Sequence, residues 1–549
     1  MTADVVARGT RSPAEPLAAT GALIRLILRR DRIRLGVWIG AIAGFTVLFA
    51  AALPGVYADE SERQARAALI GNPGVRAFAG PGYGLDDYTF GAMLAQEYLS
   101  FTAIFVALMA FLLVARYTRV EEETGRAELV RAGVVGRHAH ATAALVVVGG
   151  AGLTVGALIA IGLGSLGMEG ATWPSSWLFG MSLASIGLVF AAIAALTAQL
   201  TEHGRGAAGL AGALFAGAYL VRAAGDMAEV GGGWLSWFSP IGWAQQTRVY
   251  VADRWWPLLL SVALTVMLAA LAYWLSTRRD LAAALRRPRP GPATASRWLS
   301  GPFRLAARLH RASVLWWSAG VFLFALGYGS LAGEVERFIT ELATIDEWIA
   351  GIGGQTMIES FLGVIVLMIA VAVAAFAILT VQRPAGEEGT GRVEPVLAAA
   401  TSRTRWLGSH VAVALAGSAL LMLLGGLGLG LSASAALGDP EIVPKLIRAG
   451  LVYLPAIWLT VATAVALFGL SSRAVGWAWV IVAYSGVIVI FGDLLGLPDW
   501  VVRLSPFGHT PLLPAEDLRW APLVWLTVLA AALLAAGLVA FRRRDVAAT

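Results

Sequence analysis

The sequence predicts an all-α membrane protein in which twelve membrane-spanning helices form two parallel six-helix repeats. Hydrophobic residues make up 58% of the 549 residues and charged residues only 14%, whereas soluble domains carry about 25% charged residues. Apolar stretches of about 20 residues, enough to cross a bilayer, recur along the chain. The same short motifs also occur in both halves. These observations exclude a soluble globular enzyme, a disordered chain and a fibrous protein.

Twelve apolar runs without charged residues account for the predicted spans. Most exceed the roughly 18 residues that indicate a spanning helix. The runs cover residues 35–57, 98–115, 141–168, 173–200, 206–221, 255–277, 312–333, 360–382, 411–437, 449–472, 474–492 and 521–541. With twelve spans, the arginine-rich segments all fall on one side, which the positive-inside rule makes cytoplasmic. We therefore expect both termini in the cytoplasm and the chain in the bacterial plasma membrane.

The segments between the spans predict the domain organisation. Residues 1–20 form a flexible cytoplasmic tail, and residues 21–34 are amphipathic, as in a helix that lies along the membrane surface. The first six-span half covers 21–280, a proline- and arginine-rich cytoplasmic linker covers 281–300, and the second half covers 301–549. The first apolar run is too long for a signal peptide. The net charge of +6 follows from topology, and no nucleic-acid partner is expected.

An internal repeat relates the two halves. The loop after the second span reads E-E-E-T-G-R-A-E from Glu121, and the loop after the eighth reads E-E-G-T-G-R-V-E from Glu387. Six of the eight positions match, at an offset of 266 residues. The same offset relates the S-P-x-G turns that begin at Ser239 and Ser505. Because each copy holds an even number of spans, the halves are predicted to be parallel, with a symmetry axis along the membrane normal.

The acidic inner loops are candidate docking elements. Glycine permits a turn, and a helix N-terminus favours the acidic residues around it. The alternative is a solvated, charge-balanced loop, and repetition in both halves favours docking into a partner's groove.

The S-P-x-G turns are predicted to open short helices on the outer side. Serine caps a helix and proline fits its first turn. The flanking segments, 231–250 and 494–514, are too short to span and are predicted to be re-entrant hairpins. The turn residues are Ser239, Pro240, Gly242, Ser505, Pro506 and Gly508. The alternative is an ordinary amphipathic outer loop.

Several kinds of site are absent from the sequence. The chain has no cysteine, and only His138 and His140 among its histidines have a metal-ligand spacing. That pair lies in an arginine-rich inner loop and is expected to be solvated, so no metal site is expected. A P-loop requires G-K-[ST], but the single lysine, Lys445, lies between Pro444 and Leu446. We therefore expect no cofactor in this chain and no catalytic residue. Any ATP-driven activity would require a separate ATPase.

These features resemble the membrane subunit of ABC-2 type transporters, with a type V exporter-like fold. The duplicated form is similar to the actinobacterial permeases that export polyketide antibiotics, the tetronasin-type family. The resemblance covers residue 21 to the C-terminus. It implies an ATP-driven exporter of hydrophobic or amphipathic compounds, with two copies of an ATPase subunit that bind ATP and Mg²⁺.

The resemblance also implies that the inner loops couple the permease to this ATPase. The implied coupling residues are Glu121, Glu122, Gly125, Arg126, Glu128, Glu387, Glu388, Gly391, Arg392 and Glu394. Gly389 departs from Glu123, and Pro395 departs from Leu129, so the second contact is expected to be weaker.

Two alternative functions would require residues that the sequence does not supply. A proton-coupled twelve-span transporter would also have parallel halves, but it needs a basic loop after the second span and a carboxylate within a span. The sequence instead offers Glu97 and Glu359 at span ends, where interfacial positions are the simpler interpretation. A membrane-embedded enzyme would need a cluster of catalytic residues that the sequence lacks.

Aromatic residues on the first, second and fifth spans of each half are candidates for the substrate cavity, although lipid-facing positions explain them equally well. They are Trp38, Phe45, Phe101, Phe105, Phe215, Tyr219, Trp317, Phe322, Phe361 and Tyr484. The identity of the substrate does not follow from the sequence.

Overall fold

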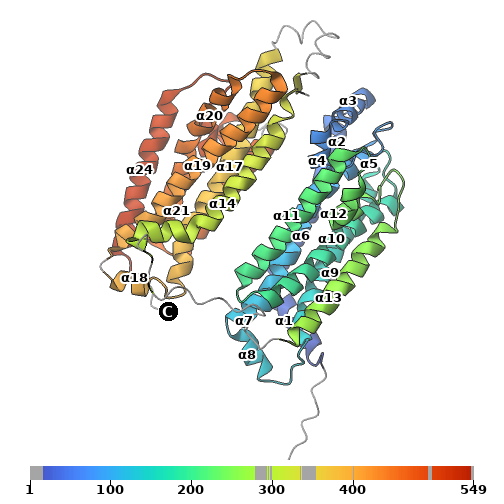
Figure 1. Ribbon diagram of the computed structural model, residues 1–549, viewed down its shortest axis with the longest axis horizontal. Helices are drawn as coiled ribbons and strands as arrows, with labels where there is room; N and C mark the ends of the chain where they lie inside the picture. The colour runs from blue at the N-terminus through green and yellow to red at the C-terminus, as the bar shows by residue number, and fades with distance from the viewer. Residues whose placement is uncertain are drawn as a thin grey trace, which may run out of the picture. The chain divides into compact units, whose positions relative to one another are not determined.

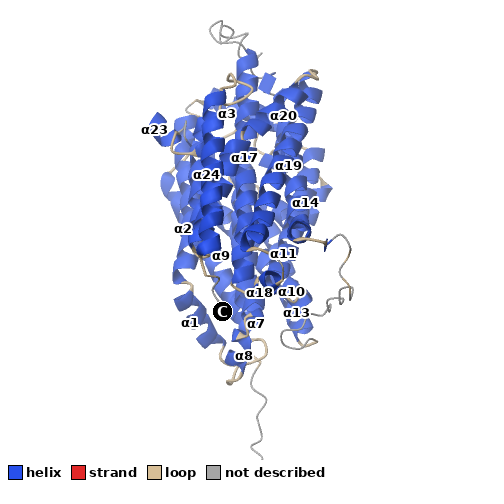
Figure 2. Cartoon of the chain, turned by 90° about the vertical axis from the view of Figure 1, so that its left-hand side faces the viewer, coloured by secondary structure: helices blue, strands red, loops and turns tan. Residues whose placement is uncertain are grey.

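A computed structural model describes residues 16–57, 59–278, 294, 296, 299–333, 335–336, 354–399, 401–491 and 498–545. All regular elements in these ranges are helices, as Figure 2 shows. Contacts divide the chain into two compact units, Met1–Pro290 and Gly291–Thr549. In each unit the long helices run side by side (Figure 1).

The described residues of the first unit contain six candidate membrane spans. They are α2 (Arg32–Val56), a continuous segment Phe90–Glu123, α9 (Ala139–Leu166), α10 (Trp173–Leu200), α11 (Gly204–Ala228) and α13 (Pro257–Ser276). The second span is built from α5 (Phe90–Met93), α6 (Leu99–Ala115) and α7 (Glu121–Glu123), joined by π-helical turns at Leu94–Tyr98 and Arg116–Val120. The predicted span over 173–200 has the bounds of α10.

Shorter helices complete the first unit. They are α1 (Thr20–Arg30), α3 (Glu60–Ile70), α4 (Pro73–Ala79), α8 (Arg126–Arg131), a 3-10 helix over Trp234–Phe238 and α12 (Pro240–Gln245). The amphipathic helix predicted over 21–34 ends earlier, at Arg30, because Asp31 interrupts it before α2 begins. The Asp31 carboxylate is buried and binds Arg34 at 2.9 Å and Arg116 of the second span at 3.4 Å.

The second unit contains five candidate spans in its described residues. They are α14 (Pro302–Gly329), the part Met357–Glu388 of α17 (Gly354–Glu388), α19 (Arg403–Leu437), the pair α20 (Ile442–Val452) and α21 (Leu454–Leu470), and α24 (Trp520–Arg543). The remaining helices are α18 (Glu394–Ala398), α22 (Trp479–Phe491), α23 (Asp499–Val502) and 3-10 helices at Ala474–Ala478 and Pro506–His509.

The structure therefore has eleven candidate spans among the described residues, and the prediction of twelve is not confirmed. The difference lies at 474–492, where the chain begins as a 3-10 helix and continues as α22 to Phe491, and residue 492 lies outside the described residues.

Small residues bring neighbouring spans into close contact within each unit. A Cβ atom added to Gly156 of α9 would collide with the backbone of Gly180 of α10, and the reverse holds for Gly180. In the second unit, Gly469 of α21 and Gly537 of α24 show the same close approach. Because lipid gives helices no hydrophobic reason to associate, such close backbone packing supplies much of the contact energy.

Each unit has two distinct ends. We call the end with the E-E-x-T-G-R-x-E loop the motif end, and the end with the S-P-x-G turn the turn end. In the first unit, α13 runs from the turn end to the motif end, where the Ser276 Oγ lies 3.3 Å from the His138 Nδ1. Figure 1 shows α7 and α8 at one end of this unit and α3 at the other. In the second unit, Arg544 at the end of α24 contacts the motif loop.

Candidate functional site

Three acidic residues open the first motif loop, and each contacts another element of the first unit. Glu121 is buried, and its Oε1 lies 2.8 Å from the Nη1 of Arg30 in α1. Glu122 pairs at 2.5 Å with Arg119, a fully buried side chain. The Oε2 of Glu123 accepts a hydrogen bond of 3.0 Å from the backbone N–H of residue 204, at the start of α11. These contacts fix the first half of the loop to three other elements.

The second motif loop is anchored by different partners. Glu388 is buried and binds Arg544 of the C-terminal segment at 2.6 Å. The Arg544 guanidinium also lies over the ring of Phe541, 5.4 Å from its centroid. Glu387 binds Arg383 at 3.3 Å, one helical turn earlier. Gly389 stands where the first loop has Glu123, so the side-chain contact to a helix N-terminus has no counterpart here.

A glycine divides each loop into an anchored part and an exposed part. Gly125 and Gly391 have φ angles of +73° and +68°, a conformation that residues with a Cβ rarely adopt. After Gly125, the side chains of Arg126 and Glu128 are exposed on α8, and Leu129 is 79% exposed. After Gly391, Arg392 and Glu394 are also exposed. After its glycine, each loop therefore presents exposed charged side chains, of which Arg126 lies 4.0 Å from the Glu121 carboxylate.

The S-P-x-G turns cap short helices at the turn end. The Ser239 Oγ accepts a hydrogen bond of 3.2 Å from the N–H of Ile241, and Pro240 occupies the first turn of α12. The Ser505 Oγ accepts the equivalent bond from Phe507, also at 3.2 Å, with Pro506 in the first turn. Gly242 and Gly508 permit close backbone packing, since an added Cβ would collide with Ser236 and Val502 respectively. The re-entrant arrangement stays a prediction, and residues 494–497 lie outside the described residues.

Four of the predicted cavity residues meet at one place in the first unit. Trp38, Phe45 and Phe105 line an apolar cavity of about 240 Å³ between α2 and α6. Phe101 adjoins them, with its ring centroid 5.2 Å from that of Phe105. In the second unit, Trp317 lines a cavity of about 480 Å³ between α14 and α17, together with Trp316 and Phe324. Each unit therefore has an aromatic cavity on its first two spans, and each cavity includes a tryptophan of the first of those spans.

The other predicted cavity residues lie elsewhere. Phe215 packs against Phe190, with centroids 5.1 Å apart, and Tyr219 lies under the guanidinium of Arg222 at 4.3 Å. The Tyr484 hydroxyl donates a hydrogen bond of 2.6 Å to the carbonyl of Val501. Phe322 and Phe361 are half-buried and do not line either aromatic cavity.

The comparisons with known proteins agree with a membrane permease. A family model described as "Multidrug efflux system permease Rv1217c, C-terminal domain" matches residues 22–275 and 299–542. The multidrug efflux system permease protein Rv1217c of Mycobacterium tuberculosis is 40% identical over 544 residues, which cover 98% of this chain and 97% of that protein. The chain belongs to the Rv1217c family of multidrug efflux permeases. The eleven candidate spans among its described residues make this member a multi-pass membrane protein.

The environment of Glu97 in this permease is not evident from the sequence. Its carboxylate receives three hydrogen bonds from the Arg66 guanidinium of α3, the shortest 2.6 Å, and one of 3.0 Å from the Tyr88 hydroxyl. Burial by itself would lower the pKa of Arg66, but the charge and hydrogen bonds of Glu97 raise it overall. The pKa of Tyr88 is raised, mainly because the hydroxyl is buried and to a smaller extent because of the charge of Glu97. Arg66 therefore stays charged and neutralises Glu97, which fits the interfacial interpretation.

A fully buried ion pair was also missed. Arg222 and Asp226 of α11 lie 3.1 Å apart, and neither side chain is more than 1% exposed. Asp226 also accepts a hydrogen bond of 2.7 Å from the Ser236 hydroxyl, and its backbone carbonyl accepts one of 2.9 Å from Arg76. The spacing of four residues in α11 was visible in the sequence, and it is the one signal that could have identified the pair.

Proposed function

We propose that this chain is the membrane-spanning permease subunit of an ATP-driven ABC-2 type exporter. It extrudes hydrophobic or amphipathic compounds, including antibiotics of the polyketide class. Support comes from membership of the Rv1217c family, whose curated relative is named a multidrug efflux system permease. The two aromatic cavities have the apolar lining that such compounds require.

The observation that carries this proposal is the division of each motif loop. Glu121, Glu122, Glu387 and Glu388 fix the loops to the permease, while Glu128 and Glu394 remain exposed beside a glycine turn. Anchoring one side of a loop so firmly makes its other side a rigid surface. A rigid, charged surface suits a partner that must transmit a conformational change.

The partner in this proposal is a separate ATPase subunit, present in two copies. Each copy binds ATP and Mg²⁺ and contacts one motif loop, so the permease itself hydrolyses nothing. The absence of a G-K-[ST] sequence supports this division of labour. The two halves of the permease are parallel six-span repeats. In chain order, residues 474–492 form the eleventh of these twelve spans, in addition to the eleven candidates in the structure. Both termini and the motif ends are cytoplasmic.

Mass measurement of the solubilised complex tests the proposal. The expected composition is one copy of this chain with two copies of the ATPase. ATP hydrolysis should be absent from the purified chain and should appear with the ATPase, with stimulation by exported compounds. Two copies of this chain per ATPase pair would contradict the proposed stoichiometry. Export that continues after deletion of the ATPase would contradict the energy source.

A further inference from the structure

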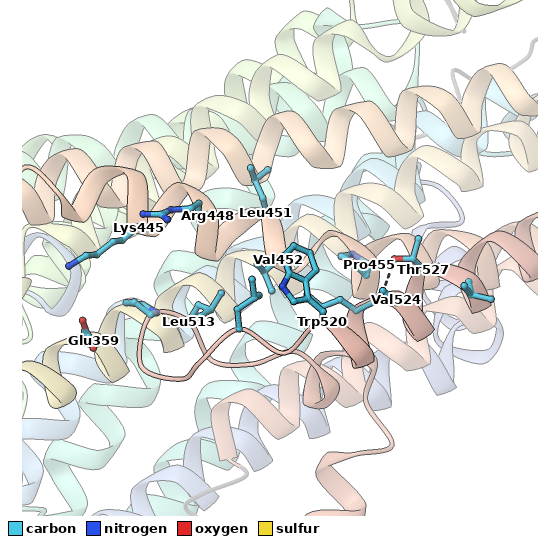
Figure 3. Close-up of a pocket in the computed structure, with 14 residues that line it drawn as sticks. Glu359, Lys445, Arg448, Leu451, Val452, Pro455, Leu513, Trp520, Val524 and Thr527 are labelled. Carbon is cyan, nitrogen blue, oxygen red and sulfur yellow. Dashed lines mark hydrogen bonds between the residues drawn. The ribbon is translucent and has the colours of Figure 1, made fainter.

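An amphipathic groove lies at the turn end of the second unit and shares no lining residue with the aromatic cavity of that unit. It has a volume of about 810 Å³ and is formed by α20, α21, α24 and the segment before α24. Lys445, Arg448 and Glu359 supply its charged end (Figure 3). Leu451, Val452, Pro455, Leu523 and Val524 supply apolar walls.

The charged and apolar parts of the groove are separated along its length. On α20 and α21 the lining residues 445, 448, 452 and 455 follow helical spacing, so they share one face over roughly 15 Å at 1.5 Å per residue. On α24 the lining residues 520, 523, 524, 527 and 528 do the same. Figure 3 shows Lys445 and Arg448 at one end, Trp520 between, and Thr527 towards the other end.

The charge at the polar end favours an anion. Within the described part of the chain, neither Lys445 nor Arg448 has an acidic side chain within ion-pair distance, and Arg448 donates only to the carbonyl of Pro444, at 3.2 Å. With Glu359 as the single carboxylate, the charged side chains of the groove sum to +1. The first unit differs, because the carboxylate of Glu97 there is bound by Arg66.

We propose that this groove binds an anionic phospholipid. Lys445 and Arg448 hold the phosphate, and one acyl chain lies along the apolar faces of α21 and α24. The order of the polar and apolar parts along the groove fits a lipid. The polar end lies where the spans begin, and the apolar walls lie further along the spans. Trp520 occupies the level at which tryptophan is enriched in membrane proteins. The glycerol hydroxyls of phosphatidylglycerol would donate to Glu359.

Native mass spectrometry of the full-length chain tests this proposal. The wild-type protein, equilibrated with equal amounts of phosphatidylglycerol and phosphatidylcholine, should retain one phosphatidylglycerol preferentially. The double variant Lys445→Ala, Arg448→Ala should bind it about 30-fold more weakly, from the usual contribution of two cations near an anionic lipid surface. The swapped variant Lys445→Arg, Arg448→Lys keeps both charges and should retain the lipid.

The control removes two cations from the turn ends outside the groove, by Arg254→Ala with Arg519→Ala. It should leave lipid retention unchanged. Equal retention of phosphatidylcholine by the wild-type chain would overturn the proposal, as would unchanged phosphatidylglycerol binding by the double alanine variant. Equal loss in the control would show that net charge alone attracts the lipid. If oleate binds at this groove and phosphatidylglycerol does not, the occupant is a single-chain acid and the proposal is wrong.

Discussion

If the motif loops contact an ATPase as proposed, reversing their exposed carboxylates is expected to disconnect that ATPase while leaving the permease folded. The perturbation is Glu128→Arg together with Glu394→Arg. Both side chains are exposed in the structure and neither makes an ion pair with a described residue. Each lies in the first turn of a short helix, so its reversal costs about 0.3–1 kcal/mol through the helix dipole. Yield and thermal stability of the permease should therefore change little.

The cost at the docked interface is larger. A charge that becomes buried against a partner contributes about 2–5 kcal/mol when it is disrupted, and each 1.4 kcal/mol is a factor of ten. The ATPase should therefore bind the double variant roughly 30- to 4,000-fold more weakly. We expect Glu128→Arg alone to cost more than Glu394→Arg alone, because Leu129 adds an exposed apolar contact that Pro395 replaces in the second loop.

Three assays follow the double variant: co-purification with the ATPase, compound-stimulated ATP hydrolysis and drug export from cells. The matched control places the same charge reversals at the turn ends, by Glu229→Arg with Glu441→Arg, two other exposed carboxylates. The control should keep all three activities. Wild-type export by Glu128→Arg with Glu394→Arg would refute the reasoning, since it would show that these loops are only solvated.

The buried pair, the interfacial carboxylate and the aromatic cavities give three further predictions. Asp226→Asn leaves Arg222 buried without its counter-charge, so the free energy of unfolding should fall by about 3–5 kcal/mol, and a denaturation midpoint equal to wild type would contradict this. Glu97→Gln should leave the pH profile of export unchanged, because Arg66 already neutralises the carboxylate; a shifted profile would favour proton coupling. Trp38→Ala should alter the range of compounds exported, measured as resistance profiles, while stimulated ATP hydrolysis by the remaining substrates persists; an identical range would exclude that cavity as a binding site.

The sequence predicted the positions of most spans because a membrane helix must be apolar over a defined length. The bounds 173–200 and α10 coincide, and most other predicted runs lie largely within a candidate span. The exception, 474–492, is apolar enough to span but starts in 3-10 geometry. Hydropathy measures composition and does not determine where a helix tightens or ends, so this break could not be read from the residues.

The sequence did not reveal which motif residues face the protein. Glu121 and Glu128 occupy the same acidic motif, yet one is buried and the other exposed. The deciding partners, Arg30 and Arg544, lie 91 residues before Glu121 and 156 residues after Glu388. A local motif contains no information about partners so distant. For the same reason, the lipid-facing and cavity-facing aromatic residues could be separated only once α2 and α6 were placed together.

The anchoring of the two loops has a practical consequence for handling this protein. The first loop is held by a helix close to the start of the chain, and the second by an arginine that lies five residues before the last residue. Affinity tags and fluorescent fusions are usually joined at these two places. A tag attached directly after Arg544, or a truncation that removes α1, would alter one loop and leave the other intact. Purification handles for this permease belong in a loop at the turn end, where neither anchor is disturbed.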